Sequence, residues 1–382
     1  MFAHRKLSFG GGERVLVEQI ASLAHTPIQV SVLFRKDKRR RDLESEIRQR
    51  NPQVATIEYR PSLWGVYRWI KKHRPDVVVL CNHKGAAGAL ILLALQGIKI
   101  PLLVTLHEHY PRHLQKYRWI ARWVDAWICT YDFSLTVRRE LSGAPCHVMH
   151  PIYVDHLPQP PEEIQEASRQ AARALWSIPS DAFVLGYCGQ VDTRKDPHAF
   201  IQLGVYLESA LGRPVTLLLA GRIDPLFRDQ IQNYATKSRL RGSLVLTGAL
   251  DHFEDAFRCL DLFALTSRNE GFFPISLIES LHFGVPIVAP TVGGIESVAR
   301  GHRGVFLIDK DDDRQAIPLS SLKRVARQIA TVHQHPQRWE AEKKGTRDLL
   351  LTLIDAVKHQ PDRKSTRLNS SHVSESRMPS SA

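Results

Sequence analysis

Two carboxylates in the second half of the chain stand where they could bind a ligand that carries hydroxyl groups and phosphates. Glu270 lies on a loop that follows the strand-like run 261–265. Glu279 lies beyond it, with eight residues between, inside a helix predicted to open at about Pro274. Backbone N–H groups at a helix start favour anions, and a carboxylate accepts hydrogen bonds from hydroxyl groups. A phosphorylated, polyhydroxylated ligand needs both kinds of contact.

A glycine-rich run near the start of the chain, Gly10-Gly-Gly-Glu-Arg14, precedes a helix predicted from Val15 to Leu23. Gly11 and Gly12 would let the backbone approach a ligand closely, and the helix start adds affinity for anions. The dinucleotide fingerprint requires a third glycine where this chain has Val15, which argues against NAD binding. A simple turn is the alternative interpretation of this run.

The segment from Arg268 to Gly294 resembles the donor-sugar loop of the retaining glycosyltransferases of family 4, which have the GT-B fold. In that family two glutamates are separated by seven positions and are followed by a Gly-Val-Pro-Val-Val-Ala strand. Here the loop before Pro274 is one residue longer. An insertion in a loop need not rotate the helix that carries Glu279. The resemblance covers about residues 2–358 and is strongest over 183–300.

The resemblance implies roles for a second loop, Gly189-Gln-Val-Asp-Thr-Arg-Lys195. Lys195 matches the family lysine that holds the donor diphosphate. Gln190 stands where the family has an arginine, which removes a fixed charge and a bidentate donor, and Arg194 or Arg222 is a candidate substitute. A lysine on a solvated loop is the structural alternative for Lys195.

The catalytic residues implied by the resemblance are His107, Glu270 and Lys195. His107 ends a predicted strand, and the carboxyl ends of strands face the ligand in such folds; His109 is the fallback. Glu270 would hold the donor sugar and Glu279 the ribose. The other expected donor contacts are Gly11, Gly12, Gly189, Gln190, Arg194, Gly271, Phe272, Phe273, Gly293 and Gly294.

The reaction implied is transfer of a sugar from a nucleotide-diphosphate donor to a glycan or lipid-linked hydroxyl, with an α-linkage. No metal or other cofactor is expected. Two alternatives remain. The extra loop residue and Gln190 could mark a catalytically degenerate GT-B protein that only binds a nucleotide sugar or a partner. A GT-B epimerase would release free nucleotide without an acceptor.

Composition describes a globular protein with a basic first half. Apolar residues make up 43% and charged residues 24% of the 382 residues, and the formal net charge is +13. Residues 1–150 hold about 24 Lys and Arg against about 12 Asp and Glu. We expect a cytoplasmic protein that approaches anionic membranes through this half; a solvated basic surface is the alternative. No recognition motif for nucleic acid accompanies the charge.

Two sequence details bear on these expectations. Trp119, Trp123 and Trp127 recur every fourth residue and are predicted to share a helix face, either in the core or at a membrane surface. The five cysteines are scattered, without Cys-x-x-Cys pairs, and are predicted to be reduced core residues. A disulfide framework or zinc site is therefore not expected.

Strand-like and helical stretches alternate throughout, which is typical of α/β domains with parallel sheets. We expect a GT-B architecture of two Rossmann-like domains facing across a cleft, with an acceptor-side domain at 1–157 and a nucleotide-sugar domain at 158–361. The predicted strands are 29–34, 54–59, 76–81, 102–106, 126–130, 146–150, 183–188, 214–220, 243–247, 261–265, 286–289 and 304–308.

Both ends of the chain depart from the family pattern. Met1-Phe-Ala-His4 is too short and too polar for a central strand, so a truncated first strand is expected. Residues 362–382 are Ser-rich and aperiodic, resemble translated sequencing-adapter DNA, and are expected to be a disordered, artefactual tail.

Overall fold

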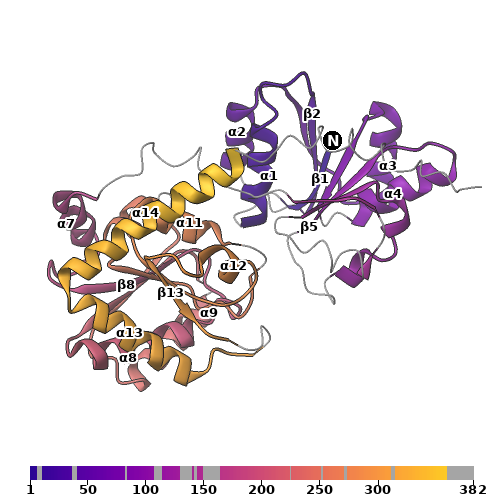
Figure 1. Cartoon of the computed structure of the whole chain (residues 1–382). Helices are drawn as coiled ribbons and strands as arrows, with labels where there is room; N and C mark the ends of the chain where they lie inside the picture. Colours follow the sequence, from indigo (N-terminus) through magenta and orange to yellow (C-terminus); the bar gives the residue numbers. More distant parts are fainter. Residues whose placement is uncertain are drawn as a thin grey trace, which may run out of the picture.

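The computed structural model describes residues 1–6, 11–36, 41–81, 84–106, 114–129, 140–141, 144–148, 164–223, 225–250, 253–270, 273–310 and 315–358. Figure 1 shows these residues arranged as two α/β domains, each with helices on both sides of one sheet. The predicted domain boundary after residue 157 and the expected tail at 362–382 lie outside the described residues.

The N-terminal domain has a parallel sheet in the order β3-β2-β1-β4-β5-β6-β7. Its strands are β1 (Phe2–Lys6), β2 (Val30–Lys36), β3 (Val54–Tyr59), β4 (Val78–Cys81), β5 (Leu102–Leu106), β6 (Ala126–Cys129) and β7 (Cys146–Val148). Its helices are α1 (Gly11–Ala21), α2 (Arg41–Arg50), α3 (Leu63–His73) and α4 (Lys84–Leu95), with 3₁₀ turns η1 (Gln115–Tyr117) and η2 (Ala121–Trp123). In Figure 1, α1 and α2 cover one face of this sheet and α3 and α4 the other.

The interpretation of Met1-Phe-Ala-His4 as too short and too polar for a central strand is wrong, because Phe2–Lys6 forms one. It pairs with β2 over Phe2–Lys6 and with β4 over Phe2–His4. Phe2, Ala3 and His4 are all buried there. Central parallel strands are covered on both faces, and the five residues of β1 pair with the seven of β2 on one side and the four of β4 on the other.

The C-terminal domain has a parallel sheet in the order β10-β9-β8-β11-β12-β13. Its strands are β8 (Phe183–Cys188), β9 (Val215–Ala220), β10 (Leu244–Gly248), β11 (Leu262–Ala264), β12 (Ile287–Pro290) and β13 (Val305–Ile308). Its helices are α7 (Glu166–Ala174), α8 (Pro197–Leu211), α9 (Pro225–Lys237), α10 (Glu254–Arg258), α11 (Ile275–His282), α12 (Ile295–Ala299), α13 (Leu319–His333) and α14 (Pro336–Lys358). The long helix α14 packs against α11 and α13.

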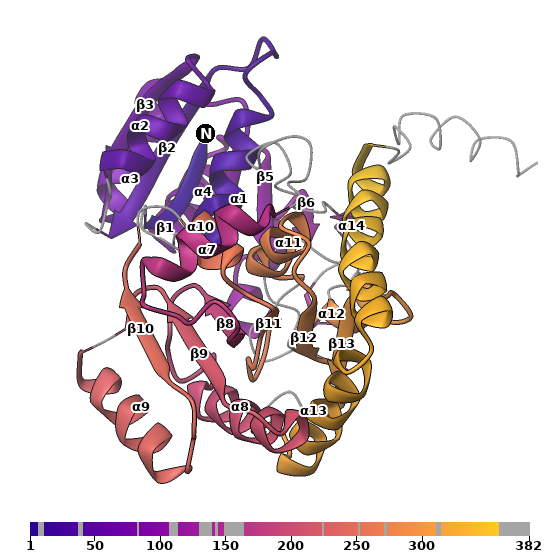
Figure 2. The same ribbon diagram turned by 90° about the vertical axis from the view of Figure 1, so that its left-hand side faces the viewer.

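The two domains meet at helix α1. Val15 of α1 is buried in the same apolar cluster as the core of the C-terminal domain. Figures 1 and 2 both show α1 on the side of its domain that faces the C-terminal domain. The start of α1 is therefore held beside the second sheet, which matters for the glycines at its first turn.

The tryptophan prediction is wrong, because Trp119, Trp123 and Trp127 do not share a helix. Trp119 lies in a turn, Trp123 in η2 and Trp127 in strand β6. Trp127 is fully buried, whereas Trp119 is exposed. The fourfold spacing is therefore a coincidence of a turn, a 3₁₀ segment and a strand, and it gives no interfacial face.

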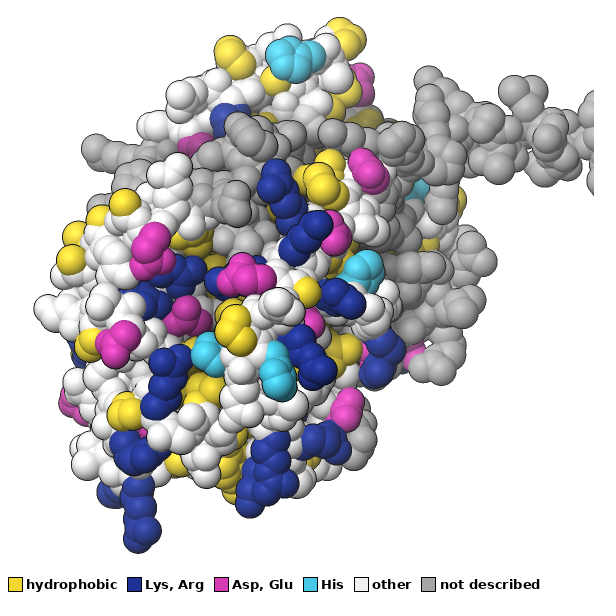
Figure 3. Space-filling view, turned by 60° about the vertical axis from the view of Figure 1, so that its left-hand side comes forward, with side chains coloured by type: hydrophobic (Ala, Val, Ile, Leu, Met, Phe, Trp, Pro, Cys, Tyr) yellow, Lys and Arg dark blue, Asp and Glu magenta, His cyan; other side chains and the backbone are white. Residues whose placement is uncertain are grey.

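Four of the five cysteines are buried, and none of the five forms a disulfide. Cys129 and Cys146 lie on neighbouring strands with their sulfur atoms 2.9 Å apart. None of the described helices combines the length and the apolarity that crossing a membrane requires. Figure 3 shows Lys and Arg side chains lying among Asp, Glu and His over the surface of the C-terminal domain, so this face has mixed charge.

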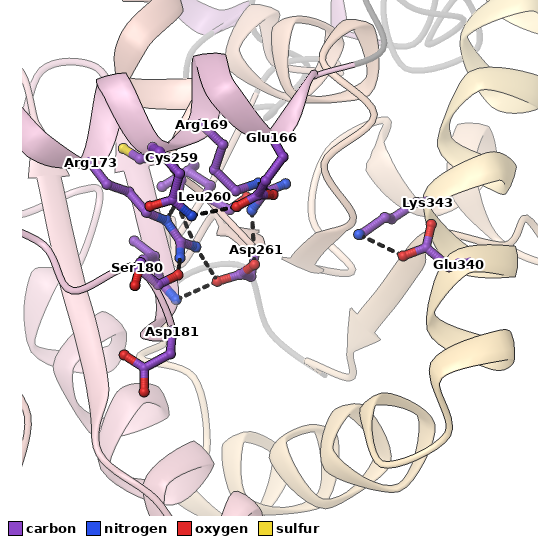
Figure 4. Close-up of polar contacts among 12 residues, drawn as sticks. Glu166, Arg169, Arg173, Ser180, Asp181, Cys259, Leu260, Asp261, Glu340 and Lys343 are labelled. Atoms are coloured by element: carbon purple, nitrogen blue, oxygen red, sulfur yellow. Dashed lines mark hydrogen bonds and ion pairs between the residues drawn. The ribbon is translucent and has the colours of Figure 1, made fainter.

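A buried ion network fixes the amino ends of the central strands in the C-terminal domain (Figure 4). Asp261, just before β11, accepts hydrogen bonds from Arg169 and Arg173 of α7, each at 2.9 Å. The same carboxylate accepts from the backbone N–H of Val184 in β8 at 2.8 Å. One side chain therefore ties α7, β8 and β11 together at the end of the sheet opposite the candidate site.

Replacing Asp261 by asparagine is expected to lower the free energy of unfolding by about 3 kcal/mol, because it leaves two arginines without their buried counter-charge. Urea unfolding followed by fluorescence measures this loss. Asp255→Asn is the matched control, since Asp255 pairs with Arg258 on the half-exposed surface of α10. Equal stabilities for the two variants would contradict the structural role given to Asp261.

Candidate functional site

The candidate site lies where the strand order of the C-terminal sheet reverses. From β8 the chain continues outward to β9 and β10, whereas β11, β12 and β13 extend in the other direction. Ligands of open α/β sheets bind outside the carboxyl ends of the strands at such a switch point. The loop that carries Lys195 follows β8, and the loop that carries Glu270 follows β11, so the two loops flank this point.

The two loops meet through Lys195, Arg194 and Glu270. Lys195 Nζ lies 2.5 Å from one carboxylate oxygen of Glu270. Arg194 Nη1 lies 3.2 Å from the other oxygen and 3.3 Å from the carbonyl oxygen of Asn269. The side chains of Lys195 and Glu270 are 13% and 10% exposed, whereas that of Arg194 is 44% exposed. The structure thus brings together three residues that the sequence analysis had predicted separately.

The electrostatics of this triad favour an ionised glutamate. Burial by itself would raise the pKa of Glu270, but the charges of Lys195 and Arg194 outweigh it and hold the pKa below the ordinary value. Burial lowers the pKa of Lys195, and the neighbouring Arg194 charge lowers it further, against the opposing effect of Glu270. Two cations in a partly desolvated position can neutralise an anionic ligand strongly.

The loop after β8 depends on a close approach between two glycines. Gly189 has φ of +142° and Gly221 has φ of +139°, and a Cβ added to Gly221 would lie 2.0 Å from the carbonyl oxygen of Gly189. Only glycine permits this contact between the ends of β8 and β9. Gln190 is exposed, and its carbonyl oxygen accepts a hydrogen bond from the buried Tyr187 hydroxyl at 3.1 Å.

Helix α11 carries Glu279, the second predicted carboxylate of the site. The helix follows Pro274, as predicted. Glu279 is partly buried, and its charge adds to burial in raising the pKa of the thiol of Cys188, the last residue of β8. Phe273 is 3% exposed and belongs to the apolar core. Its side chain therefore fixes the helix start, and any contact with a ligand would come from its backbone.

The remaining predicted residues are placed only in part. Gly11 and Gly12 form the first turn of α1 itself, so the helix begins earlier than Val15. Gly293 is left-handed with φ of +59°, and Gly294 precedes α12 and accepts the hydroxyl hydrogen bond of Ser297 at 3.0 Å. His107, His109, Gly271 and Phe272 lie outside the described residues, so their roles stay predictions.

Three residues around the triad were missed by the sequence analysis: Asp196, Arg268 and Lys310. Arg268 donates to Asp196 at 2.9 Å, and Lys310 donates to the carbonyl oxygen of Arg268 at 2.5 Å. Asp196 and Arg268 each stand within two positions of a predicted site residue, which was the available signal. Lys310, just beyond β13, gave no such sequence signal, because it comes close to the site only through the order of the strands in the sheet.

Two family models match this chain. The description "Glycosyl transferases group 1" covers residues 168–323, and "Glycosyltransferase Family 4" covers residues 9–152. The first match includes strands β8 to β13 of the C-terminal sheet, and the second includes strands β2 to β7 of the N-terminal sheet. Together they extend over most of both described domains.

Several curated proteins are similar to the chain. A UDP-Gal:alpha-D-GlcNAc-diphosphoundecaprenol alpha-1,3-galactosyltransferase of Escherichia coli is 23% identical over 274 residues, covering 68% of this chain and 69% of that protein. A lipopolysaccharide core biosynthesis mannosyltransferase, LpsB, of Rhizobium meliloti is 29% identical over 60% of this chain and 63% of its own length. The chain spans about half the length of the D-inositol 3-phosphate glycosyltransferase of Saccharomonospora viridis, at 26% identity over 205 residues.

Solved structures share the arrangement of both domains. Anabaena Alr3699/HepE in complex with UDP and glucose superposes with a TM-score of 0.71 at 16% identity, covering 97% of this chain and all of that one. WaaG, a glycosyltransferase involved in lipopolysaccharide biosynthesis, gives a TM-score of 0.61 at 16% identity. At these identities the likeness is one of fold.

Proposed function

Since this chain belongs to the family 4 glycosyltransferases and has the GT-B fold, we propose that it transfers a sugar from a nucleotide-diphosphate donor to an acceptor hydroxyl with retention, giving an α-linkage. The observation that carries the proposal is the meeting of Lys195 and Glu270 from two loops at the switch point of the C-terminal sheet. A cationic group for a diphosphate and a carboxylate for sugar hydroxyls are thereby held within contact of one another.

In the proposed reaction the bond from the anomeric carbon to the diphosphate oxygen breaks, and a bond to the acceptor oxygen forms. The transition state is oxocarbenium-like, and negative charge grows on the leaving diphosphate. Lys195 and Arg194 neutralise that charge, while Glu270 turns to the sugar hydroxyls once the diphosphate takes its cations. The leaving phosphate accepts the acceptor's proton, so no protein carboxylate has to act as a nucleophile or base.

The test uses purified protein with UDP-, GDP- and ADP-sugars, each with and without candidate saccharide or lipid-linked acceptors. We expect turnover that depends on both a donor and an acceptor, and a product whose anomeric proton coupling in NMR reports an α-linkage. A β-linked product would refute retention. Donor binding with no turnover would support the degenerate alternative, and free nucleotide formed equally without acceptor would support the epimerase alternative.

The proposed role of Glu279 is to accept hydrogen bonds from the donor ribose. Glu279→Gln is expected to weaken donor binding about tenfold, because an amide oxygen is a weaker acceptor than a carboxylate. Calorimetric titration with the donor's nucleoside diphosphate measures the change, and the 2′,3′-dideoxy nucleotide should bind both forms alike. Unchanged affinity in the variant would refute the ribose role.

The rate should depend on pH through Lys195 and Glu270. Because kcat/KM reports the free enzyme, its alkaline limb is expected below 10.5 and its acid limb below 4.5, following the lowered pKa of each group. Arg194 lowers both pKa values, so Arg194→Gln should move both limbs to higher pH. An alkaline limb that does not respond to Arg194→Gln would show that another group titrates there.

We further propose that the acceptor is lipid-linked and is reached at the cytoplasmic face of a membrane. One similar protein is named for a diphosphoundecaprenol-linked substrate and another for lipopolysaccharide core biosynthesis, which supports a lipid-linked acceptor. Helix α3 offers a suitable surface, since Trp64 is 61% exposed and Lys71 and Lys72 are exposed about two turns further along the helix. Exposed Trp with Lys is the combination that interfacial helices use. In Figure 1 this helix covers the face of its sheet opposite α1.

Co-sedimentation with vesicles tests whether the α3 surface binds anionic membranes. The vesicles are phosphatidylcholine with and without about 30% phosphatidylglycerol, a composition chosen to supply anionic headgroups. Sedimentation is expected only with the anionic vesicles and is expected to fall severalfold in Lys71→Glu/Lys72→Glu, at about 1 kcal/mol per basic residue. Lys323→Glu/Arg327→Glu, at two exposed positions of α13, is the charge-matched control. Equal sedimentation of both variants would exclude α3 as the binding surface.

A further inference from the structure

Asp196, directly after Lys195, has a backbone conformation that residues other than glycine rarely adopt. Its φ angle is +48°, in the left-handed region, and its side chain is only 5% exposed. Asp tolerates this region better than most residues and is also a favoured residue before a helix. One carboxylate oxygen of Asp196 accepts a hydrogen bond from the backbone N–H of Ala199 at 3.3 Å, at the start of α8.

The second carboxylate oxygen of Asp196 reaches the neighbouring loop. It accepts a hydrogen bond from Arg268 Nε at 2.9 Å. The backbone N–H of Arg268 donates to the carbonyl oxygen of Arg194 at 2.8 Å. Asp196 follows Lys195, and Arg268 precedes Glu270 by two positions, so this pair bridges the two loops beside the Lys195–Glu270 contact.

Two further residues tie the same loops. Thr266 donates its hydroxyl to the carbonyl oxygens of Lys195 at 3.0 Å and Asp196 at 3.1 Å. Lys310 donates from Nζ to the carbonyl oxygen of Arg268 at 2.5 Å, which joins the loop to the end of β13. The loop after β11 is therefore tied to the Lys195 loop on one side and to the end of β13 on the other. Asp196, the residue with the left-handed backbone, lies between Lys195 and the first turn of α8.

We propose that Asp196 and Arg268 are positioning residues: their ion pair sets the separation of Lys195 and Glu270, and with it the geometry in which the donor diphosphate and sugar are held. The inference rests on the proposed function. Neither residue needs to contact the donor for this role. The carboxylate of Asp196 both pairs with Arg268 and caps helix α8. The start of α8, Lys195 and Glu270 therefore form one rigid unit.

The test compares Asp196→Asn, Arg268→Gln and the double variant with the unmodified protein. Asn keeps the helix cap and tolerates the left-handed conformation, so the fold is preserved while the charge is lost. Each single variant is expected to lower kcat about tenfold with a smaller change in KM, since misplacement of reacting groups acts on the rate. The kcat of the double variant should be no lower than that of the less active single variant. Arg268→Lys should recover part of the kcat that Arg268→Gln loses.

A second readout does not depend on turnover: the rate at which an amine-reactive reagent modifies Lys195, followed by mass spectrometry. We expect this rate to rise severalfold in both single variants but not in Glu340→Gln, which breaks an exposed ion pair on α14 (Figure 4). The inference would be overturned if the losses of kcat in the two single variants added up in the double variant. It would also be overturned if the single variants matched Glu340→Gln in both kcat and labelling rate. Absence of turnover in the unmodified protein with a raised labelling rate in the variants would refute the proposed function alone.

Discussion

Replacing Lys195 by alanine is expected to lower kcat about a thousandfold, which is the scale of removing one group that stabilises developing charge in a transition state. Lys195 is the less exposed of the two cations that contact Glu270, and it lies at the carboxyl end of β8. The remaining cation, Arg194, is 44% exposed, so solvent screens its charge and it cannot replace the less exposed lysine. Initial rates at saturating donor and acceptor measure the loss.

The matched control is Lys323→Ala, which removes an exposed lysine from α13 in the same domain. It should leave kcat within a factor of two or so, as surface substitutions usually do. A Lys195→Ala variant that turns over like this control would mean that other groups neutralise the leaving diphosphate. Thermal unfolding of both variants checks that the loss is one of function and not of fold.

Glu270→Gln is expected to change turnover and nucleotide affinity in opposite directions. The carboxylate contacts both Lys195 and Arg194, so a diphosphate must compete with it for these cations. Removing this negative charge favours the anion by at least about 1 kcal/mol, the value for two charges in bulk water, or at least about fivefold in affinity. kcat should nevertheless fall about a hundredfold, because the carboxylate acceptor for the sugar hydroxyls is lost.

Calorimetric titration with nucleoside diphosphate and steady-state kinetics together test this opposition. Glu340→Gln provides a control for removing one negative charge from the same domain. Weaker nucleotide binding in Glu270→Gln would show that the glutamate organises the two cations and does not compete with the ligand. Undiminished kcat would remove Glu270 from the catalytic set.

Much of the fold was readable from the sequence because parallel strands buried on both faces are short apolar runs between turns. Every predicted strand has an observed counterpart, including 183–188, which matches β8. The first strand was misjudged because its polar residues, such as His4, are buried between β2 and β4. Whether a polar residue such as His4 is buried depends on which strands flank its own strand, and the residues of that strand alone do not show this.

The candidate site was predicted at the level of loops and not at the level of contacts. Lys195 and Glu270 were each found from motifs, but their ion pair spans 75 positions in the sequence and follows from the adjacency of β8 and β11. Lys310 reaches the site only because β13 lies on the same side of the switch point as β11. The tryptophan spacing failed for the converse reason, since a fourfold repeat has meaning only within a continuous helix.

The central claim is that Lys195, held against Glu270, recognises the diphosphate of the donor. The most direct measurement is calorimetric titration with the mono- and diphosphate of the nucleoside that binds best among uridine, guanosine and adenosine. The account predicts that the unmodified protein binds the diphosphate at least about tenfold more tightly than the monophosphate, and that Lys195→Ala loses this preference. An equal preference in both proteins would contradict it.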